Sequence, residues 1–497
     1  MTTAPPAPVG RDHDLEHGNL VARLTALAAV HGWSDRPAYL VDGVAHTYAE
    51  VYRGAGRAAA AFAARGLGRG SRVLLALPDG VELVRAFLGA LWIGAVAVPV
   101  NVDLHQDELR QAAGIARPDA VVSAPGSVLP ATITAAELAV DAPAPPCADV
   151  DALSPAFGAF TSGTTGAPKL VVHSHGDPAV FERAIASVVG IRPGEVTFSV
   201  SRLYFVYGLG NSLFFPLHRG GTAVLSPTRA TEDDALRLIE RHGVTVFYGQ
   251  PSFYARLLGH PRHGVLSRLR LALVAGEVLP EALEARLREV LGERLLNVFG
   301  TTETGHALVA NAPGASRAST IGRVLPPYRL RVVDQGGAEV PAGVEGSLEV
   351  AGPSIVRGGR SGTDAPERVT SWYATGDAAT VDEDGFVRLH GRLDDIEIVG
   401  GQNVHPTEIE DLLVRHPDVR EAGVCSARRG TGVTALRAFV ALREGASPER
   451  VREQLLETAR RALTWYKVPE DVMFVPELPR TPTGKLRRGD LRAMAAR

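Results

Sequence analysis

Residues 73–100 read VLLALPDGVELVRAFLGALWIGAVAVPV, in which a short apolar run ends at a proline, a segment with helical spacing follows at Val81–Trp92, and a second apolar run covers Ala95–Val100. A helical pattern at Leu109–Ile115 and an apolar run at Ala120–Val122 continue the alternation. Continuous apolar runs that alternate with helices are typical of strands buried on both faces of a parallel sheet. The stretch therefore predicts an α/β fold.

The same alternation returns in the middle of the chain. Three predicted strands, Val244–Tyr248, Leu269–Ala275 and Leu295–Phe299, are separated by segments with helical spacing. Each strand runs into a short polar turn, and these turns are Gly249-Gln250-Pro251, Gly276-Glu277 and Gly300-Thr301-Thr302-Glu303. In open α/β sheets, ligands bind at the carboxyl ends of the strands. We therefore expect a binding site where the three turns meet.

Two changes of pattern divide the chain. Short predicted strands separated by Gly, Asp and Pro indicate a small β-rich subdomain at about 322–391. A Pro- and Ala-rich stretch at 142–155 is typical of a linker between subdomains. The sequence thus predicts a large α/β N-terminal domain at 1–392, which contains parallel sheets and the β-rich subdomain. A small, mobile α+β lid domain at 393–497 is expected to follow it.

The composition is that of an ordinary globular protein, with 45% hydrophobic and 22% charged residues among 497. A formal net charge of −3 without a long basic block argues against binding to nucleic acid through charge alone. Cys147 and Cys425 are too few for a disulfide framework or a cysteine-based metal site. The apolar stretch 86–100 is shorter than the roughly 18 residues of a membrane span, and the N-terminus lacks a signal-peptide pattern. We expect a cytoplasmic protein without nucleic-acid or membrane partners.

The clearest chemical signal is the segment Thr161-Ser162-Gly163-Thr164-Thr165-Gly166-Ala167-Pro168-Lys169. Small hydroxyl residues and two glycines let hydrogen-bond donors surround an anion, and Lys169 adds a positive charge. The apolar runs Ala156–Phe160 and Leu170–Val172 flank the segment, which weighs against an ordinary surface turn. It is not a Walker loop, because the lysine is followed by leucine rather than by serine or threonine. We predict a phosphate-binding loop.

Five further motifs follow this loop in the order found in acyl-adenylate-forming enzymes, the superfamily of acyl- and aryl-CoA ligases, peptide-synthetase adenylation domains and firefly luciferase. The chain resembles this superfamily from Thr161 to Lys485. The motifs are Asn297–Glu303 for adenine and metal, Tyr373–Asp377 for ribose, Gly391–Asp395 for the hinge, Gly400–Glu410 for the loop and helix behind it, and Pro479–Lys485 for the catalytic lysine. Each motif alone is weak, but their common order is specific.

The resemblance implies that ATP and Mg²⁺ activate a carboxylic acid. A carboxylate with a pKa of about 4 is already ionised, so charge compensation and positioning, rather than a general base, are expected to drive its attack on ATP. The implied catalytic residues are Lys485, Thr302, Glu303 and Phe205, and Glu303 is also the implied Mg²⁺ ligand. The implied ATP- and AMP-binding residues are Thr161, Ser162, Gly163, Thr164, Thr165, Gly166, Lys169, Gly276, Glu277, Asn297, Phe299, Gly300, Thr301, Asp377 and Arg392.

The segment Leu203–Asn211 is similar to that of benzoate-CoA ligases, and so is the position of His306. Phe205 stands where the family carries a gating aromatic, whereas Tyr204 is interpreted as core packing. The segment has no Asp that could pair with an ammonium group, which disfavours an amino-acid substrate. The predicted residues of the substrate pocket are Val206, Tyr207, Gly208, Ala275, Gly300, His306 and Ala307.

Asp394 is the implied hinge, about which the lid rotates between two half-reactions. After rotation, Gly400, Gly401 and His405 are expected to line the path of the thiol, since glycine allows close approach of a pantetheine arm. The same loop can equally serve only to open the following helix. Glu397 is a charge in an otherwise apolar run after the hinge and departs from the family's pattern.

These features together predict an AMP-forming acid–thiol ligase that activates a benzoate-like acid and transfers the acyl group to CoA. An alternative is a stand-alone enzyme that loads the phosphopantetheine of an acyl carrier protein, because one tunnel serves both acceptors. The presence of Lys485 and Glu303 disfavours a non-catalytic nucleotide-binding protein. No Gly-x-Gly-x-x-Gly motif follows a strand, which disfavours a nicotinamide oxidoreductase. The ring substituents, and whether the chain is a monomer or a homodimer, stay open.

Overall fold

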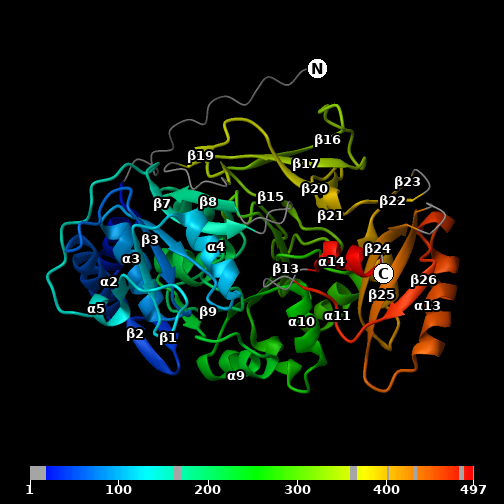
Figure 1. Ribbon diagram of the computed structural model, residues 1–497, viewed down its shortest axis with the longest axis horizontal. Helices are drawn as coiled ribbons and strands as arrows, with labels where there is room; N and C mark the ends of the chain where they lie inside the picture. The colour runs from blue at the N-terminus through cyan, green and yellow to red at the C-terminus, as the bar shows by residue number, and fades with distance from the viewer. Residues whose placement is uncertain are drawn as a thin grey trace.

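The computed structural model describes residues 18–161, 169–358, 366–399, 402–428, 434–480 and 486–495. Two large sheets with helices between and around them make up most of the molecule, and the C-terminal segment forms a separate unit at one end (Figure 1). In the described part of the chain, no helix has the length and apolar character needed to cross a membrane.

The first sheet has six strands in the order β6-β5-β3-β4-β7-β8. They are β3 (Arg72–Ala76), β4 (Val96–Pro99), β5 (Ala120–Ser123), β6 (Ile133–Thr134), β7 (Pro155–Thr161) and β8 (Lys169–Ser174). All neighbours are parallel except β7 and β8. The helices of this region are α2 (Tyr48–Ala63), α3 (Val81–Trp92), α4 (Gln106–Ala116) and α5 (Ala135–Leu138). The predicted alternation over 73–122 is confirmed.

The second sheet has nine strands in the order β15-β14-β13-β12-β11-β9-β10-β1-β2. Its parallel centre consists of β1 (Pro37–Val41), β9 (Val196–Ser199), β10 (Thr222–Leu225), β11 (Val246–Gly249), β12 (Leu271–Val274) and β13 (Leu295–Phe299). Antiparallel edge strands are β2 (Val44–Thr47), β14 (Val309–Ala310) and β15 (Arg323–Val324). The helices are α1 (Leu20–Val30), α6 (Asp177–Ala186), α7 (Val206–Leu209), α8 (Phe215–Arg219), α9 (Glu232–His242), α10 (Pro251–Gly259) and α11 (Glu281–Leu291), with the π-helix η2 (Gly210–Phe214) between α7 and α8.

The central strands are buried on two faces, which explains their continuous apolar runs. In β12, Leu273 belongs to the core between the two sheets, whereas Val274 belongs to a second core on the outer face. Helices α2 and α3 fill the layer between the sheets and pack closely there. A Cβ added at Gly89 of α3 would lie 2.6 Å from the Cβ of Ala58 in α2, so this contact requires glycine.

The predicted β-rich unit is present. Its antiparallel sheet has the order β16-β17-β20-β21, formed by β16 (Arg329–Val333), β17 (Gly346–Ala351), β20 (Tyr373–Val381) and β21 (Val387–Arg392). A separate ladder joins β18 (Val356–Arg357) to β19 (Glu367–Arg368), and β18 contacts β8 of the first sheet.

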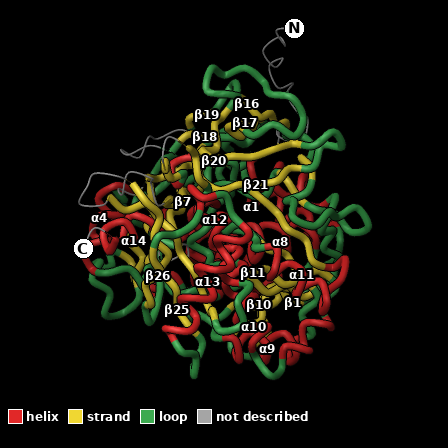
Figure 2. The backbone as a smooth tube through the Cα atoms, turned by 90° about the vertical axis from the view of Figure 1, so that its right-hand side faces the viewer, coloured by secondary structure: helices red, strands yellow, loops and turns green. Residues whose placement is uncertain are grey.

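The C-terminal unit faces the viewer in Figure 2 and has its own sheet and core. The sheet has the order β24-β25-β26, with β24 (Val419–Arg428), β25 (Thr434–Leu442) and β26 (Asp471–Phe474). A hairpin of β22 (Glu397–Val399) and β23 (Gln402–Val404) precedes it, and the helices are α12 (Pro406–Val414), α13 (Pro448–Ala462) and α14 (Arg488–Ala495). The predicted fold class, a large α/β part followed by a small α+β unit, is confirmed.

Candidate active site

The carboxyl ends of β11, β12 and β13 lie side by side, because these strands are parallel neighbours. The turns that follow them therefore meet at one edge of the sheet, as predicted. The carboxylate of Glu277 accepts hydrogen bonds from the backbone N–H and the hydroxyl of Ser252, at 3.2 and 3.1 Å. This contact ties the turn after β12 to the start of α10.

The predicted phosphate loop joins two paired strands. Thr161 at the end of β7 lies opposite Lys169 at the start of β8. Ser162, Gly163, Thr164, Thr165 and Gly166 lie outside the described residues. The hairpin fixes where the loop begins and ends, while the binding of phosphate stays a prediction.

The turn after β13 has a backbone held by its own side chains. Thr304 Oγ1 accepts the N–H of Thr301 at 2.9 Å and donates to the carbonyl oxygen of His306 at 3.0 Å. A Cβ at Gly300 would lie 2.1 Å from that same carbonyl oxygen, and Gly305 has a φ of +88°. Both positions thus need glycine, the first for close approach and the second for its left-handed conformation.

Two contacts from other segments hold the carbonyls of this turn. The N–H of Val356 in β18 donates to the carbonyl oxygen of Glu303 at 2.9 Å. His173 Nε2 in β8 lies 2.8 Å from the carbonyl oxygen of Thr302. Neither contact was predicted, because no local pattern reveals a hydrogen bond between such distant segments.

Glu303 is a partly exposed carboxylate that is hydrogen bonded to Tyr373. Burial, and then the charge of Glu303, raise the pKa of Tyr373, so its hydroxyl stays protonated and donates to the carboxylate. Among the described residues, no group of three or more His, Cys, Asp or Glu could hold a metal ion. Mg²⁺ commonly binds one or two carboxylates and completes its shell with water and phosphates. The partly exposed carboxylate of Glu303 fits that ion.

The two residues predicted to bind ribose, Asp377 and Arg392, contact each other across neighbouring strands. Asp377 in β20 lies opposite Arg392 in β21, with 3.3 Å between Asp377 Oδ2 and Arg392 Nη1. Arg392 also donates to the carbonyl oxygen of Thr375 at 2.7 Å. A Cβ at Gly376 would lie 2.5 Å from the guanidinium, so glycine leaves the room that Arg392 occupies.

The remaining predicted nucleotide residues lie at the same edge. Asn297 is buried in β13 and donates to the carbonyl oxygen of Thr320 at 3.4 Å. Phe299 ends the strand and is half-buried, and Gly276 has a φ of +92° in the turn after β12. Their contacts with adenine stay predictions.

Two stacked rings form one wall of the predicted substrate pocket. The rings of Tyr207 in α7 and His306 have centroids 5.0 Å apart and planes inclined by 22°. This separation leaves no room for a third ring between them, so the two side chains present one surface. Phe215 meets His306 edge-on at 4.6 Å, and Tyr248 meets Tyr207 edge-on at 6.1 Å. Sequence patterns identified neither Phe215 nor Tyr248.

The wall is uncharged at neutral pH. Burial lowers the pKa of His306 to about 3, so its imidazole is neutral and Nε2 donates to Asn211 Oδ1 at 3.1 Å. Burial also raises the pKa of Tyr207. The amide of Asn211 donates in turn to Ser199 Oγ at 3.3 Å.

The other predicted pocket residues are small or apolar and buried; they are Val206, Gly208, Ala275 and Ala307. A Cβ at Gly208 would lie 2.0 Å from the carbonyl oxygen of Arg202, and one at Gly210 would lie 2.4 Å from the ring of His306. The helix packs closely on both sides because these residues lack side chains. The π-helical turn η2 follows directly, and such turns are frequent at functional sites.

A buried ion pair anchors the segment that carries Phe205. Asp79, just after β3, accepts the N–H of Leu203 at 3.1 Å and lies 3.2 Å from Arg202 Nε. Burial raises the pKa of Asp79 to about 6, although Arg202 opposes the rise. Phe205 is half-buried and contacts Tyr204 edge-on at 4.4 Å. Tyr204 is buried, as expected of a packing residue.

The predicted hinge residue Asp394 is exposed in a short turn, Leu393–Asp395, directly after β21. Gly400, Gly401 and Lys485 lie outside the described residues. His405 Nε2 lies 2.8 Å from Glu345 Oε1, so in this arrangement His405 contacts the β-rich unit. Its predicted place along the path of a thiol is not tested by this contact.

Glu397 has a clear structural partner. Its buried carboxylate lies 2.9 Å from Arg492 in α14. Arg488 of the same helix pairs with Glu410 at 2.6 Å and with Asp395 at 3.4 Å. The unusual charge therefore attaches the last helix to the segment behind the hinge.

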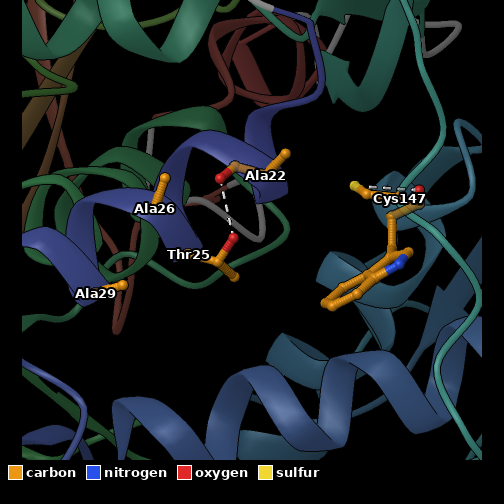
Figure 3. Close-up of a pocket in the computed structure, with 6 residues that line it drawn as sticks. Ala22, Thr25, Ala26, Ala29 and Cys147 are labelled. Atoms are coloured by element: carbon orange, nitrogen blue, oxygen red, sulfur yellow. Dashed lines mark hydrogen bonds between the residues drawn. The ribbon is translucent and has the colours of Figure 1, made fainter.

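A separate pocket borders α1 (Figure 3) and contains none of the predicted site residues. It is lined by Ala22, Thr25, Ala26, Ala29, Trp92 and Cys147. Burial raises the pKa of Cys147 to about 11, so this thiol is protonated and a poor nucleophile at neutral pH. The pocket offers no catalytic group.

Two family models identify the class of enzyme to which this fold belongs. The family model described as AMP-binding enzyme matches residues 27–358, and the model of the AMP-binding enzyme C-terminal domain matches residues 408–485. The chain belongs to this family. The second match ends at the lysine predicted to be catalytic.

Curated relatives share nearly the whole chain. The p-hydroxybenzoic acid--AMP ligase FadD22 of Mycobacterium tuberculosis is 39% identical over 491 residues, which cover 96% of this chain and 69% of the relative. The benzoate--CoA ligase of Thauera aromatica is 33% identical over 492 residues, which cover 93% of each chain.

Solved structures agree in fold. The anthranilate CoA ligase AuaEII in complex with anthranoyl-AMP gives a TM-score of 0.89 at 29% identity and covers 97% of this chain and 98% of that one. A benzoate CoA ligase from Burkholderia xenovorans LB400 gives 0.84 at 32% identity and covers 95% and 99%. The predicted resemblance to acyl-adenylate-forming enzymes of the benzoate-CoA ligase type is confirmed.

Proposed function

We propose that the chain uses ATP to convert a benzoate-like acid into an acyl-adenylate and then transfers the acyl group to the thiol of CoA. The observation that carries the proposal is the uncharged, stacked wall of Tyr207 and His306 at the sheet edge that also bears Thr302 and Glu303. Relatives and structural neighbours named for benzoate, hydroxybenzoate and anthranilate support it.

The first half-reaction brings an anionic acid to a polyanionic nucleotide. Lys169 and the loop Thr161–Gly166 would hold the phosphates, Asp377 and Arg392 the ribose, and Phe299 the adenine. Mg²⁺, with Glu303 as its protein ligand, would neutralise phosphate charge. Lys485 would bridge the acid and the α-phosphate. Electrostatic preorganisation of this kind is usually the largest single contribution to catalysis.

The pocket wall favours a neutral, planar ring over a charged one. A buried ammonium or second carboxylate would cost several kcal/mol without a partner, and the wall of Tyr207, Asn211 and His306 offers no opposite charge. Aromatic side chains interact with a planar ring by offset stacking or edge contacts. Small residues at Ala275, Gly300 and Ala307 would leave space for a ring substituent.

The second half-reaction would follow rotation of residues 393–497 about Asp394. Gly400, Gly401 and His405 would then line the path of the thiol, and Lys485 would leave the site. A carrier-protein pantetheine is the second candidate acceptor, favoured by the relative named as an acid--AMP ligase, which is longer than this chain. A cytoplasmic location, where ATP and CoA are available, also stays a prediction.

The test is a screen of pyrophosphate release with benzoate, hydroxybenzoates, aminobenzoates and a medium-chain fatty acid, with and without CoA. We expect kcat/KM to be highest for a benzoate and the product with CoA to be an aroyl thioester. A preference for the fatty acid would contradict the aromatic assignment. An adenylate that does not react with CoA would instead favour the carrier protein.

A further inference from the structure

A buried chain of polar side chains connects the phosphate-loop hairpin to the turn that carries Glu303. His173 in β8 is fully buried, with Nε2 2.8 Å from the carbonyl oxygen of Thr302 and Nδ1 3.1 Å from Asp177 Oδ2. Arg368 in β19 lies 2.7 Å from the other carboxylate oxygen of Asp177. Figure 1 shows β19 beside β8. The contacts of His173, Asp177 and Arg368 thus connect elements far apart in the sequence to Thr302.

The hydrogen-bond donors and acceptors in this cluster of side chains indicate which atoms carry protons. The carbonyl oxygen of Thr302 can only accept, and Asp177 Oδ2 already accepts the N–H of Ser174 at 2.9 Å. Nε2 of His173 therefore donates to Thr302, and Nδ1 holds the ring against Asp177. Burial acts to raise the pKa of Asp177, but Arg368 and His173 outweigh it and lower the pKa, so the carboxylate is ionised.

Two aromatic rings keep His173 in place. Its ring stacks on Phe157 with centroids 5.3 Å apart and meets Phe181 edge-on at 5.4 Å. Phe181 also occupies the space beside Gly305, where an added Cβ would overlap its ring. A shift of His173 would therefore disturb the turn itself as well as the hydrogen bond to it.

We propose that His173, Asp177 and Arg368 are positioning residues that fix Thr302 and Glu303 relative to the phosphate-loop hairpin. The inference rests on the proposed function. In adenylation, a carboxylate oxygen bonds to the α-phosphorus while the bond to the bridging oxygen breaks, and pyrophosphate leaves with that electron pair. Thr302 and Glu303 would act on these phosphates. Their position then matters before pyrophosphate leaves and much less when a thiol attacks the acyl carbonyl.

The test measures the two half-reactions separately in three variants, His173→Leu, His173→Gln and Arg368→Met. Adenylation is followed by ATP–pyrophosphate exchange with an aromatic acid, and thiol transfer by the reaction of a synthetic aroyl-adenylate with CoA. Small misplacements of reacting groups cost about 10²-fold, so we expect His173→Leu and Arg368→Met to lower the kcat of exchange by about that factor. Thiol transfer and the KM for the acid should stay within about threefold, which is under ~1 kcal/mol. His173→Gln keeps one donor for Thr302 and should recover part of the loss.

The matched control is the ion pair of Glu195 and Arg270, which lies at the amino ends of β9 and β12, in the nine-stranded sheet whose carboxyl edge carries Thr302. Glu195→Gln should change both half-reactions by one common factor. Equal losses of both half-reactions in the His173 and Arg368 variants, or unchanged exchange, would overturn the positioning role. Arg368 is at the edge of the cluster, so Arg368→Met carries the test if His173→Leu does not fold. Exchange by the wild type reports separately on the proposed function.

Discussion

Around His306 the molecule is packed and uncharged, whereas the contacts between the C-terminal unit and the rest of the molecule include polar pairs near the surface. Tyr207, His306 and Phe215 contact one another within the central core. At the junction, Glu345 pairs with His405, and Glu281 pairs with Arg415 at 3.5 Å, the latter two side chains being about half exposed.

We propose that this difference separates the part of the molecule that selects the substrate from the part that moves. A close-packed wall of aromatic rings cannot shift without loss of many contacts, so it suits discrimination between acids. Exposed polar pairs contribute little to stability and are screened by salt, so they would break and form again readily if the C-terminal unit rotates as predicted. The following predictions test this division.

Lys485→Ala should have the largest effect. Because this lysine would supply the charge between the acid and the α-phosphate, adenylation should fall about 10³-fold, or ~4 kcal/mol of barrier. Thiol transfer from a synthetic aroyl-adenylate should be nearly unchanged. Lys467→Ala, which removes a lysine paired with Glu408 in the same unit, is the matched control. Equal losses in both half-reactions would show that the lysine is not specific to adenylation.

Asp394→Pro should impair thioester formation rather than adenylation, which is the reverse of the effect expected for Lys485→Ala. Proline fixes φ, so the lid should stay near one orientation. Adenylation should survive, while thioester formation should fall by about 10²-fold, or ~3 kcal/mol. Asp394→Ala retains backbone freedom and serves as the control. If the proline variant completes both half-reactions at the wild-type rate, rotation about this residue is excluded.

Local signals in the sequence predicted much of the fold. The helical spacing of Val81–Trp92 matches α3 in full, and the predicted strand Leu295–Phe299 matches β13 in full. Helix α6 was missed because the charged residues Asp177 and Glu182 are among its seven buried residues, so no apolar stripe reveals its period. The helical form of 206–214 was not predicted, because its close packing against Arg202 and His306 depends on Gly208 and Gly210 in the folded chain.

The residues of the candidate site were likewise predicted only in part. Residues within motifs, such as Asp377 and Arg392, were found because the family pattern places them. Asp79 and His173 were missed, because each acts through a partner more than a hundred residues away. A single sequence does not show which distant residues form hydrogen bonds with each other, so only the structure reveals these contacts.

Ala307→Trp should change substrate choice without abolishing activity. Ala307 is buried in the central core, and overfilling a packed site costs roughly 1–3 kcal/mol. The kcat/KM for ring-substituted benzoates should therefore fall by about one to two decades, and that for benzoate should fall less. The comparison uses hydroxybenzoates and aminobenzoates in wild type and variant. An equal loss for all acids would place Ala307 outside the substituent space.

Glu345→Gln should have the smallest effect. Loss of its hydrogen bond with His405 should cost no more than loss of a surface ion pair, about 0.2–1 kcal/mol, so the ratio of the two half-reaction rates should shift by no more than about fivefold. The shift should fade as salt is raised, since screening weakens the wild-type pair too. An effect as large as that of Asp394→Pro would show that His405 and Glu345 form a lock rather than a weak contact.

The central claim, adenylation of an aromatic acid, is tested most directly by trapping the intermediate. The enzyme is incubated with ATP, Mg²⁺ and benzoate or a hydroxybenzoate without any thiol, then denatured, and the released small molecules are identified by mass spectrometry. We predict aroyl-AMP in an amount close to that of the enzyme, together with pyrophosphate, and its disappearance when CoA is added before denaturation. Formation of ADP and phosphate, or an adenylate only with a fatty acid, would contradict the account.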